Sequence, residues 1–183
     1  MKKIKKQLKE LIINSKIKQL EILKKRCIKS LKCRVVFDNN SVNIKIMFVG
    51  ESPGKQELKI GKPFVGRAGK FLQTEMKKIG LTRKKVYITN VLKCKTKLSK
   101  ENISKHSAFL FQQIRIIKPK IILLLGKIAT ETLLKKPFNK VRGKIIDIKG
   151  KKYIATFHPS AAQRFPKIRK LFEKDFFKLK NLI

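Results

Sequence analysis

The sequence predicts an α/β protein, a three-layer α/β/α sandwich with a short, mostly parallel central sheet. Short apolar runs alternate along the chain with longer segments of helical periodicity, which is typical of strands joined by crossover helices. One run, Ile121–Leu125, is wholly apolar, as expected for a strand buried on both faces. The chain has 183 residues, enough for one substantial core, and no repeat or low-complexity linker divides it. We therefore expect a single domain over residues 1–183.

The chain opens with a basic region at residues 1–26, where apolar side chains recur at near-helical spacing between lysines. This pattern predicts one amphipathic helix or a pair of helices. We expect further helices at 68–79, 101–117, 127–135 and from about 167, and strands at 44–49, 86–91, 121–125, 144–148 and 153–156. Gly80 and Pro119 mark the ends of two helices, because glycine accepts the left-handed conformation and proline cannot continue a helix.

The chain carries 48 Lys and Arg against 11 Asp and Glu, a formal charge of +37. A field of this sign favours a polyanion such as nucleic acid, because each phosphate contact releases counterions. The lysines are spread over nearly every segment, and Ile and Asn are also plentiful. A coding bias toward A and T is therefore an equally good source of the excess, and charge alone supports nucleic-acid binding without establishing it.

The apolar runs are too short to cross a membrane, since a span requires roughly 20 residues. The basic start, Met1–Lys6, is not followed by the apolar core of a signal peptide. Three cysteines at irregular spacing argue against the disulfide framework of a secreted protein. We expect a cytoplasmic monomer with no membrane partner.

The most informative segment follows the first strand. Residues 50–69 form a Gly/Pro-rich loop that leads from the strand into a helix, and open α/β sheets bind ligands at such carboxyl ends of strands. The loop carries a carboxylate, Glu51, and an aromatic ring, Phe64, a short distance apart. This pair suits a site that holds a planar ring and performs chemistry beside it.

Five blocks of this sequence resemble the family-four uracil-DNA glycosylases, in the order in which that family has them. They are Gly50–Gly54 with Glu57, Pro63–Gly69, Val86–Val91 with Lys93–Cys94, Leu125–Gly126, and His158–Ser160. The resemblance implies an enzyme that hydrolyses the N-glycosidic bond of uracil in DNA, releases free uracil and leaves an abasic site. Its partner would be uracil-containing DNA, whose target nucleotide must be flipped out of the helix, and it would use no nucleotide cofactor.

The resemblance also assigns roles to individual residues. Glu51 would polarise the attacking water or stabilise the cationic sugar, and His158 would hydrogen-bond uracil O2 and stabilise the departing anion. The residues implied to bind uracil are Gly50, Ser52, Phe64 and Asn90, with Phe64 as the stacking platform and Asn90 as the reader of the base edge. The family usually has alanine where Ser52 stands. Each assignment has a structural alternative: a core phenylalanine, a turn asparagine, a helix-capping glutamate or a structural histidine.

The same resemblance implies that Arg67, Ser160, Arg164 and Phe165 contact DNA. Residues 161–165 are similar to the loop that enters the duplex beside the flipped base. Either Arg164 or Phe165 would then fill the gap in the stack as a wedge.

Family members bind a [4Fe-4S] cluster through four cysteines. At the four corresponding positions this chain has Lys24, Cys27, Cys94 and His106, and Cys33 is additional. A cluster held by Cys27, Cys33, Cys94 and His106 is one interpretation, because histidine replaces cysteine in some iron–sulfur centres. An eroded, empty site is a second, and buried thiols that act as small hydrophobic side chains are a third.

Two other functions can be weighed from the residues. Gly50–Lys55 faintly resembles a phosphate-binding loop, but that motif needs one more residue between its glycines and a Ser or Thr after its Lys. Gln56 stands there instead, so we exclude a nucleotide-hydrolysing enzyme. The alternative to the glycosylase is a non-catalytic basic nucleic-acid-binding protein derived from this fold. The enzyme is favoured because the chain has all four side chains on which the chemistry and the stacking and reading of the base depend: Glu51, Phe64, Asn90 and His158.

Overall fold

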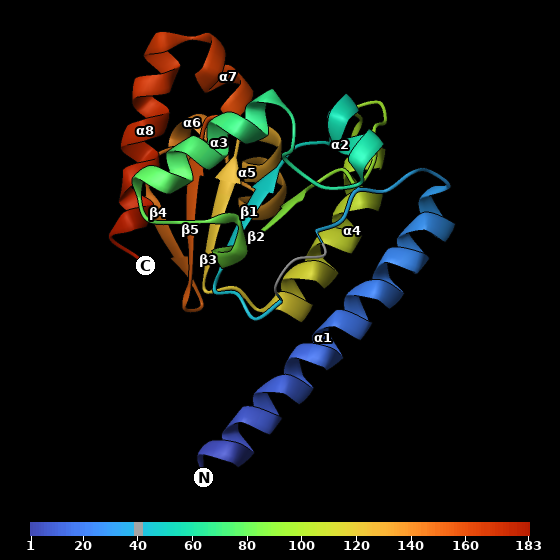
Figure 1. The fold of residues 1–183 in the computed structure, drawn as a ribbon. Coiled ribbons are helices and arrows are strands. Elements are labelled where there is room, and N and C mark those ends of the chain that lie inside the picture. The colour runs from blue at the N-terminus through green and yellow to red at the C-terminus, as the bar shows by residue number, and fades with distance from the viewer. Residues whose placement is uncertain (39–41) are drawn as a thin grey trace.

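A five-stranded sheet in the order β2–β1–β3–β5–β4 lies between two helical layers in this computed structural model, which describes residues 1–38 and 42–183 (Figure 1). The strands are β1 (Ile46–Gly50), β2 (Val86–Asn90), β3 (Ile121–Leu125), β4 (Ile145–Ile148) and β5 (Lys151–Thr156). The α-helices are α1 (Lys2–Leu31), α2 (Lys55–Ile60), α3 (Arg67–Lys78), α4 (Lys100–Ile117), α5 (Lys127–Leu134), α6 (Phe138–Val141), α7 (Pro159–Arg164) and α8 (Pro166–Lys180). A 3-10 helix, η1 (Arg83–Lys85), precedes β2.

Four of the strands are parallel, and β4 alone runs antiparallel to its neighbour β5 at one edge. The register pairs Gly50 with Asn90 and Leu125 with Thr156, so the carboxyl ends of the four parallel strands meet at one edge of the sheet. The chain steps from β1 outward to β2 and then returns across β1 to β3. Ligands bind beside such a reversal in open α/β sheets. The predicted fold class is confirmed.

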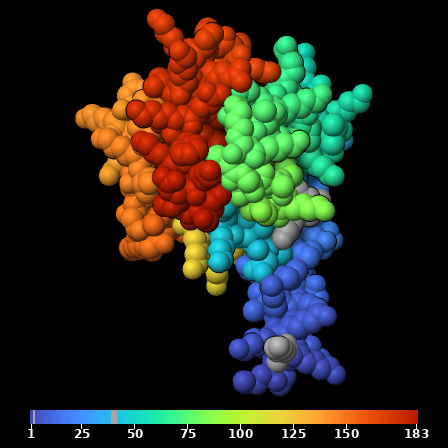
Figure 2. All heavy atoms as spheres, turned by 60° about the vertical axis from the view of Figure 1, so that its left-hand side comes forward, coloured from blue at the N-terminus to red at the C-terminus, as the bar shows by residue number. Residues whose placement is uncertain are grey.

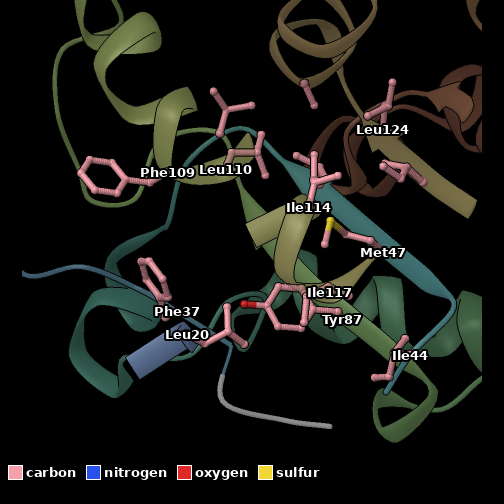
Figure 3. Packing of buried hydrophobic residues seen from close by; sticks show 14 of the residues in the cluster. Leu20, Phe37, Ile44, Met47, Tyr87, Phe109, Leu110, Ile114, Ile117 and Leu124 are labelled. Carbon is pink, nitrogen blue, oxygen red and sulfur yellow. The ribbon is translucent and has the colours of Figure 1, made fainter. Parts of the chain in front are cut away.

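Successive side chains along each strand point to opposite faces of the sheet, so they pack into two separate hydrophobic clusters. Phe48 of β1 packs in the cluster formed with α3, α7 and α8, whereas Met47 faces the cluster formed with α1, α4, α5 and α6. Figure 3 shows the second cluster, where Met47 and Tyr87 from the sheet meet Ile114 from α4. Because both faces of the sheet are covered, the two strands β1 and β3 carry no polar side chain.

Helix α1 packs on the body from Ile13 onward. Leu20, Leu23 and Cys27 are buried there, and Lys16 Nζ donates a 3.1 Å hydrogen bond to the carbonyl of Ile117. The first turns of α1 extend away from the body, as the blue segment in Figures 1 and 2 shows. Along the described chain, no helix combines the length and the apolar character that crossing a bilayer requires.

The long predicted elements are confirmed, and their bounds differ from the predicted ones by one or two residues. The N-terminal region forms a single helix that continues past residue 26 to Leu31. Three short helices, α2, α6 and α7, were not predicted, because four to six residues cannot display helical periodicity. The turn between β4 and β5 has left-handed backbone at both Lys149 and Gly150, which is the geometry of a tight hairpin.

Candidate active site

The floor of the site lies where β1 and β2 end side by side. Gly50 is paired there with Asn90, and both the Asn90 amide and the Phe64 ring lie over its Cα. A Cβ added to Gly50 would stand 2.6 Å from Phe64 Cζ and would also strike Asn90 Oδ1. Glycine at position 50 therefore allows the ring and the amide to converge.

The Asn90 side chain is almost fully buried, yet its Oδ1 atom has no hydrogen-bond partner among the described residues. Buried polar atoms are nearly always satisfied, and an exception calls for an explanation such as a missing ligand. The amide lies against an aromatic ring, at the carboxyl end of a strand. The arrangement suits a planar ligand with a hydrogen-bonding edge.

Phe64 stands in a strained backbone conformation with φ of 54°. Its loop is held by Glu57 of α2, whose Oε1 accepts hydrogen bonds from the backbone N–H groups of Val65 and Gly66 at 3.0 and 2.8 Å. On the other side, the Phe64 carbonyl lies so close to Gly69 that any side chain there would collide with it. The left-handed conformation is thus fixed by contacts on both sides of the loop.

His158 follows β5 and caps the N-terminus of α7. Its Nδ1 accepts a 3.2 Å hydrogen bond from the backbone N–H of Ser160 and lies 2.8 Å from the Ser160 hydroxyl. Because Nδ1 is an acceptor, the proton of the neutral ring resides on Nε2. Burial lowers the pKa of His158 to about 4, with a further contribution from the charge of Arg164 and an opposing one from Glu57. The site therefore holds a neutral imidazole donor at ordinary pH.

The His158 and Phe64 rings lie with their centroids 5.8 Å apart and their planes 35° apart. They border an open cavity of about 800 Å³. Among its lining residues are six predicted from the sequence: Ser52, Phe64, Arg67, His158, Ser160 and Arg164. Gln163, within the predicted loop 161–165, also lines the cavity. Two further lining residues, Lys55 and Gln56, were not predicted, because polar residues of a short surface helix carry no distinctive pattern.

Four of the predicted catalytic, uracil-binding and DNA-binding residues do not line this cavity: Gly50 and Asn90, which form the floor described above, and Glu51 and Phe165. Glu51 is partly buried and follows Gly50 directly, and its carbonyl accepts a 2.8 Å hydrogen bond from the N–H of Leu92. Phe165 stands between α7 and α8 with 54% of its surface exposed. The backbone carbonyl of Ser160 accepts a hydrogen bond from Arg164 Nε at 3.2 Å, which keeps the arginine on the cavity side.

Comparison with known proteins decides the family. The sequence profile of the Uracil DNA glycosylase superfamily matches residues 37–180. The chain belongs to the uracil-DNA glycosylase superfamily. It is 41% identical to a type-4 uracil-DNA glycosylase of Sulfurisphaera tokodaii, over 89% of this chain and 84% of the relative. It is 38% identical to a type-4 uracil-DNA glycosylase of Thermotoga maritima, over 90% of this chain and 94% of the relative. The resemblance drawn from the five motifs is thereby confirmed.

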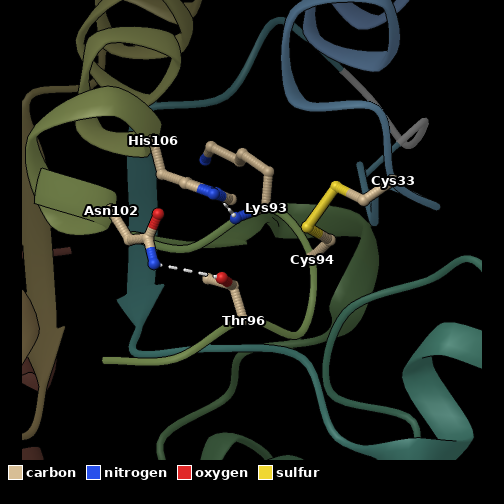
Figure 4. Close-up of a disulfide and its surroundings, with 6 residues drawn as sticks. All are labelled: Cys33, Lys93, Cys94, Thr96, Asn102 and His106. Atoms are coloured by element: carbon tan, nitrogen blue, oxygen red, sulfur yellow. Dashed lines mark hydrogen bonds between the residues drawn. A yellow bond between two sulfur atoms is a disulfide. The ribbon is translucent and has the colours of Figure 1, made fainter. Parts of the chain in front are cut away.

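The cysteines of this glycosylase superfamily member are not arranged as a cluster site. Cys33 and Cys94 form a disulfide, while Cys27 is a separate buried thiol whose pKa burial raises to about 11 (Figure 4). His106 Nδ1 accepts a 2.9 Å hydrogen bond from the backbone N–H of Lys93. Within residues 1–38 and 42–183, no group of three or more His, Cys, Asp or Glu side chains is placed to hold a metal ion.

A [4Fe-4S] cluster requires four ligands, usually deprotonated thiolates. Of the four predicted ligands, two cysteine sulfurs are joined to each other, and the His106 ring accepts a hydrogen bond at Nδ1, which leaves the proton of the neutral ring on Nε2. The predicted ligand set of Cys27, Cys33, Cys94 and His106 therefore does not fit this group in the structure.

Proposed function

We propose that this protein removes uracil from DNA by hydrolysing its N-glycosidic bond, leaving an abasic site in an uncut strand. The observation that carries this proposal is the buried, unpartnered Asn90 amide, which meets the Phe64 ring over Gly50. A flipped uracil stacked on Phe64 would present its O4 and N3–H edge to that amide. Family membership and the type-4 names of the relatives support the same substrate.

Asn90 explains the choice of uracil over cytosine. Its amide N–H donates to uracil O4, and its Oδ1 accepts from uracil N3–H. Cytosine has an amino group in place of O4 and no proton on N3, so both contacts become repulsive. A buried group left unpaired in this way typically produces strong discrimination.

The chemistry is a displacement at the sugar. The C1′–N1 bond breaks, its electron pair leaves with uracil, and a water oxygen forms the new bond to C1′ through a transition state resembling an oxocarbenium ion. The proton that the water loses ends on the departed uracil anion, which gives a sugar hydroxyl and neutral uracil. His158, neutral and with its proton on Nε2, donates to uracil O2 and stabilises the developing negative charge. Glu51 lies at the end of β1, where its carboxylate stabilises the positive sugar and orients the water.

The cavity wall supplies the contacts to the DNA backbone. Arg67, Ser160 and Arg164 line it and suit phosphate oxygens, which accept from guanidinium and hydroxyl groups. Of the two wedge candidates, we favour Phe165, because its ring is exposed whereas Arg164 is tethered to the carbonyl of Ser160. An apolar wedge fills the space that a flipped nucleotide leaves.

We further propose that the chain works without the iron–sulfur cluster that the resemblance implies. The support is the disulfide between Cys33 and Cys94 and the hydrogen-bonded ring of His106. Anaerobically purified protein should contain little iron and show no visible absorption, and denatured unreduced protein should expose one titratable thiol, that of Cys27. A full complement of iron in the purified protein would contradict this part of the proposal.

The site residues described above all lie on this one chain. We propose that the protein is a single-domain monomer that acts in the cytoplasm, and size-exclusion chromatography with light scattering checks the oligomeric state.

Single-turnover kinetics on a uracil-containing oligonucleotide test the activity and the roles together. His158→Ala should slow release of uracil by roughly 10²–10³, the usual effect of losing one preorganised donor. Glu51→Ala should slow the same step, whereas Phe64→Ala should weaken capture of the base by about 1–3 kcal/mol. Glu101→Ala, at an exposed position in the first turn of α4, is the control. Wild-type protein that binds DNA without releasing uracil would instead support the non-catalytic alternative.

A further inference from the structure

A buried lysine lies next to the residue that reads the base. Lys93 follows β2 and its side chain is completely buried. Its Nζ donates to the backbone carbonyl of Asn90 at 2.6 Å, to Thr89 Oγ1 at 3.0 Å and to Gln113 Oε1 at 2.6 Å. The three donors of the ammonium group thus meet three uncharged oxygen atoms.

Further hydrogen bonds hold these partners in place. The Thr89 hydroxyl donates to Gln113 Oε1 at 2.9 Å, and Gln113 Nε2 donates to the Tyr87 hydroxyl at 3.0 Å. Gln113 belongs to α4, whereas Tyr87 and Thr89 belong to β2, so the network ties that helix to the strand. Thr89 and Gln113 are both almost inaccessible to solvent.

The backbone of Lys93 is fixed as firmly as its side chain. Its N–H donates to His106 Nδ1 at 2.9 Å, as Figure 4 shows, and its carbonyl accepts from the N–H of Val36 at 2.7 Å. With both ends held, the ammonium group is a rigid anchor rather than a flexible surface charge.

This anchor is costly, because burial strips the charged form of its hydration and lowers the pKa of Lys93 to about 7. An apolar side chain of similar length would fill the same volume more cheaply. What the amine adds is a 2.6 Å hydrogen bond to the carbonyl of Asn90, which is strengthened further when the amine is protonated. The Asn90 Oδ1 atom has no partner of its own among the described residues, so its direction depends on this backbone and on contacts with Gly50 and Phe64.

We propose that Lys93, held by Gln113, is the positioning residue that aims the Asn90 amide at the uracil edge. This inference rests on the proposed role of Asn90 as the base reader. Lys93 does not touch the substrate; it orients the end of β2 through the Asn90 carbonyl, and its removal lets the amide drift from its productive direction.

Lys93→Met tests the inference, because methionine keeps the length of the side chain and removes the charge. The single-turnover rate on uracil should fall by about 10- to 100-fold, the range expected when a reactive geometry is misplaced by a fraction of an ångström. The preference for uracil over cytosine should fall with it, while affinity for undamaged DNA should stay unchanged. Thermal stability should change little, because the relief of a desolvated amine opposes the loss of a donor to the Asn90 carbonyl.

Tyr87→Phe is the matched control. It deletes the far end of the same buried network, the hydroxyl that accepts from Gln113, and leaves the bond from Lys93 to Asn90 in place. Its rate and base preference should match those of the wild type. Lys93→Leu provides a second variant should the methionine protein fail to fold.

A double-mutant cycle with Asn90→Ala separates this inference from the proposed function. If Lys93 acts through Asn90, adding Lys93→Met to the Asn90→Ala protein should cause no further loss of rate. The inference would be overturned, and the proposed function left standing, if the rate loss of the double variant equalled the product of the two single losses. A Lys93→Met protein with wild-type rate and base preference would have the same consequence. An Asn90→Ala protein with unchanged base preference would instead remove Asn90 from its proposed role, and the inference would fall with it.

Discussion

The carboxylate of Glu57 accepts a 2.8 Å hydrogen bond from the backbone N–H of Gly66. This contact joins α2 to the residue that caps the N-terminus of α3, and the same oxygen also accepts from the N–H of Val65. The loop that carries Phe64 therefore closes against one buried side chain. Glu57 is a structural clamp whose effect on the stacking ring can be measured.

Glu57→Ala should destabilise the protein by about 2–3 kcal/mol, because it leaves two backbone donors without a charged acceptor. The same change should slow uracil release, since the left-handed backbone at Phe64 loses its support. Glu57→Gln retains an acceptor oxygen and should recover most of the stability. Urea unfolding and single-turnover rates on the two variants check this, and an Ala variant as stable as the Gln variant would refute the clamp.

Gly50→Ala should abolish most of the activity without unfolding the protein. The new methyl group would stand 2.6 Å from Phe64 Cζ, so the ring or the Asn90 amide must move. A shift of this size at a reacting centre costs about 100-fold in rate. Glu101→Ala, at the exposed position in the first turn of α4, is the control and should behave as the wild type. Equal rates for the two variants would show that the site tolerates movement of its floor.

His158 should make the free energy of unfolding depend on pH in a defined window. Its pKa is about 4 in the folded protein and 6.5 ordinarily, so between these values the unfolded chain binds a proton that the folded chain does not. The free energy of unfolding should therefore fall as the pH drops from about 6.5 to 4, by up to about 3 kcal/mol. Urea unfolding of wild type and His158→Gln at pH 4.5 and 7 measures this difference.

The catalytic consequence is separate. Because His158 stays neutral, the single-turnover rate should show no inflection due to this residue between pH 6 and 7. An inflection there that disappears in His158→Gln would mean that the imidazole is protonated near neutrality, contrary to its buried position.

Phe165→Ala should slow excision from double-stranded DNA more than from single-stranded DNA, because only a duplex leaves a gap for a wedge. Phe177→Ala is a closely matched control, since that ring on α8 is 55% exposed, against 54% for Phe165, and does not line the cavity. The ratio of the two excision rates should change for the first variant only. Equal ratios for both variants would favour Arg164 as the wedge.

The sequence was sufficient for the sheet and for the residues that follow its strands. Apolar runs such as Ile121–Leu125 define buried strands, and parallel strands bring their carboxyl ends together, so Gly50, Asn90 and His158 could be expected at one edge. These inferences depend on local patterns and on one general rule of topology.

Side-chain partners between distant elements were not predictable in the same way. The bond from Lys93 to Gln113 joins residues 20 positions apart, and the disulfide joins Cys33 to Cys94 across 61 positions. No periodicity records such pairs, because they arise only when helices pack on the sheet. Lys93 belongs to the Lys93–Cys94 motif, but its burial could not be predicted, because nothing in the sequence distinguishes it from the many exposed lysines.

We expect the projecting start of α1 to contact DNA before any base enters the site. Residues 2–12 span about 16 Å at 1.5 Å per residue, the length of roughly 5 base pairs. Lys3, Lys5, Lys6 and Lys9 are exposed along this segment. A projecting basic helix should raise the rate of encounter with DNA and lengthen the residence time on undamaged duplex. Removal of residues 1–12 should therefore shorten the distance scanned per encounter and leave the single-turnover excision rate unchanged.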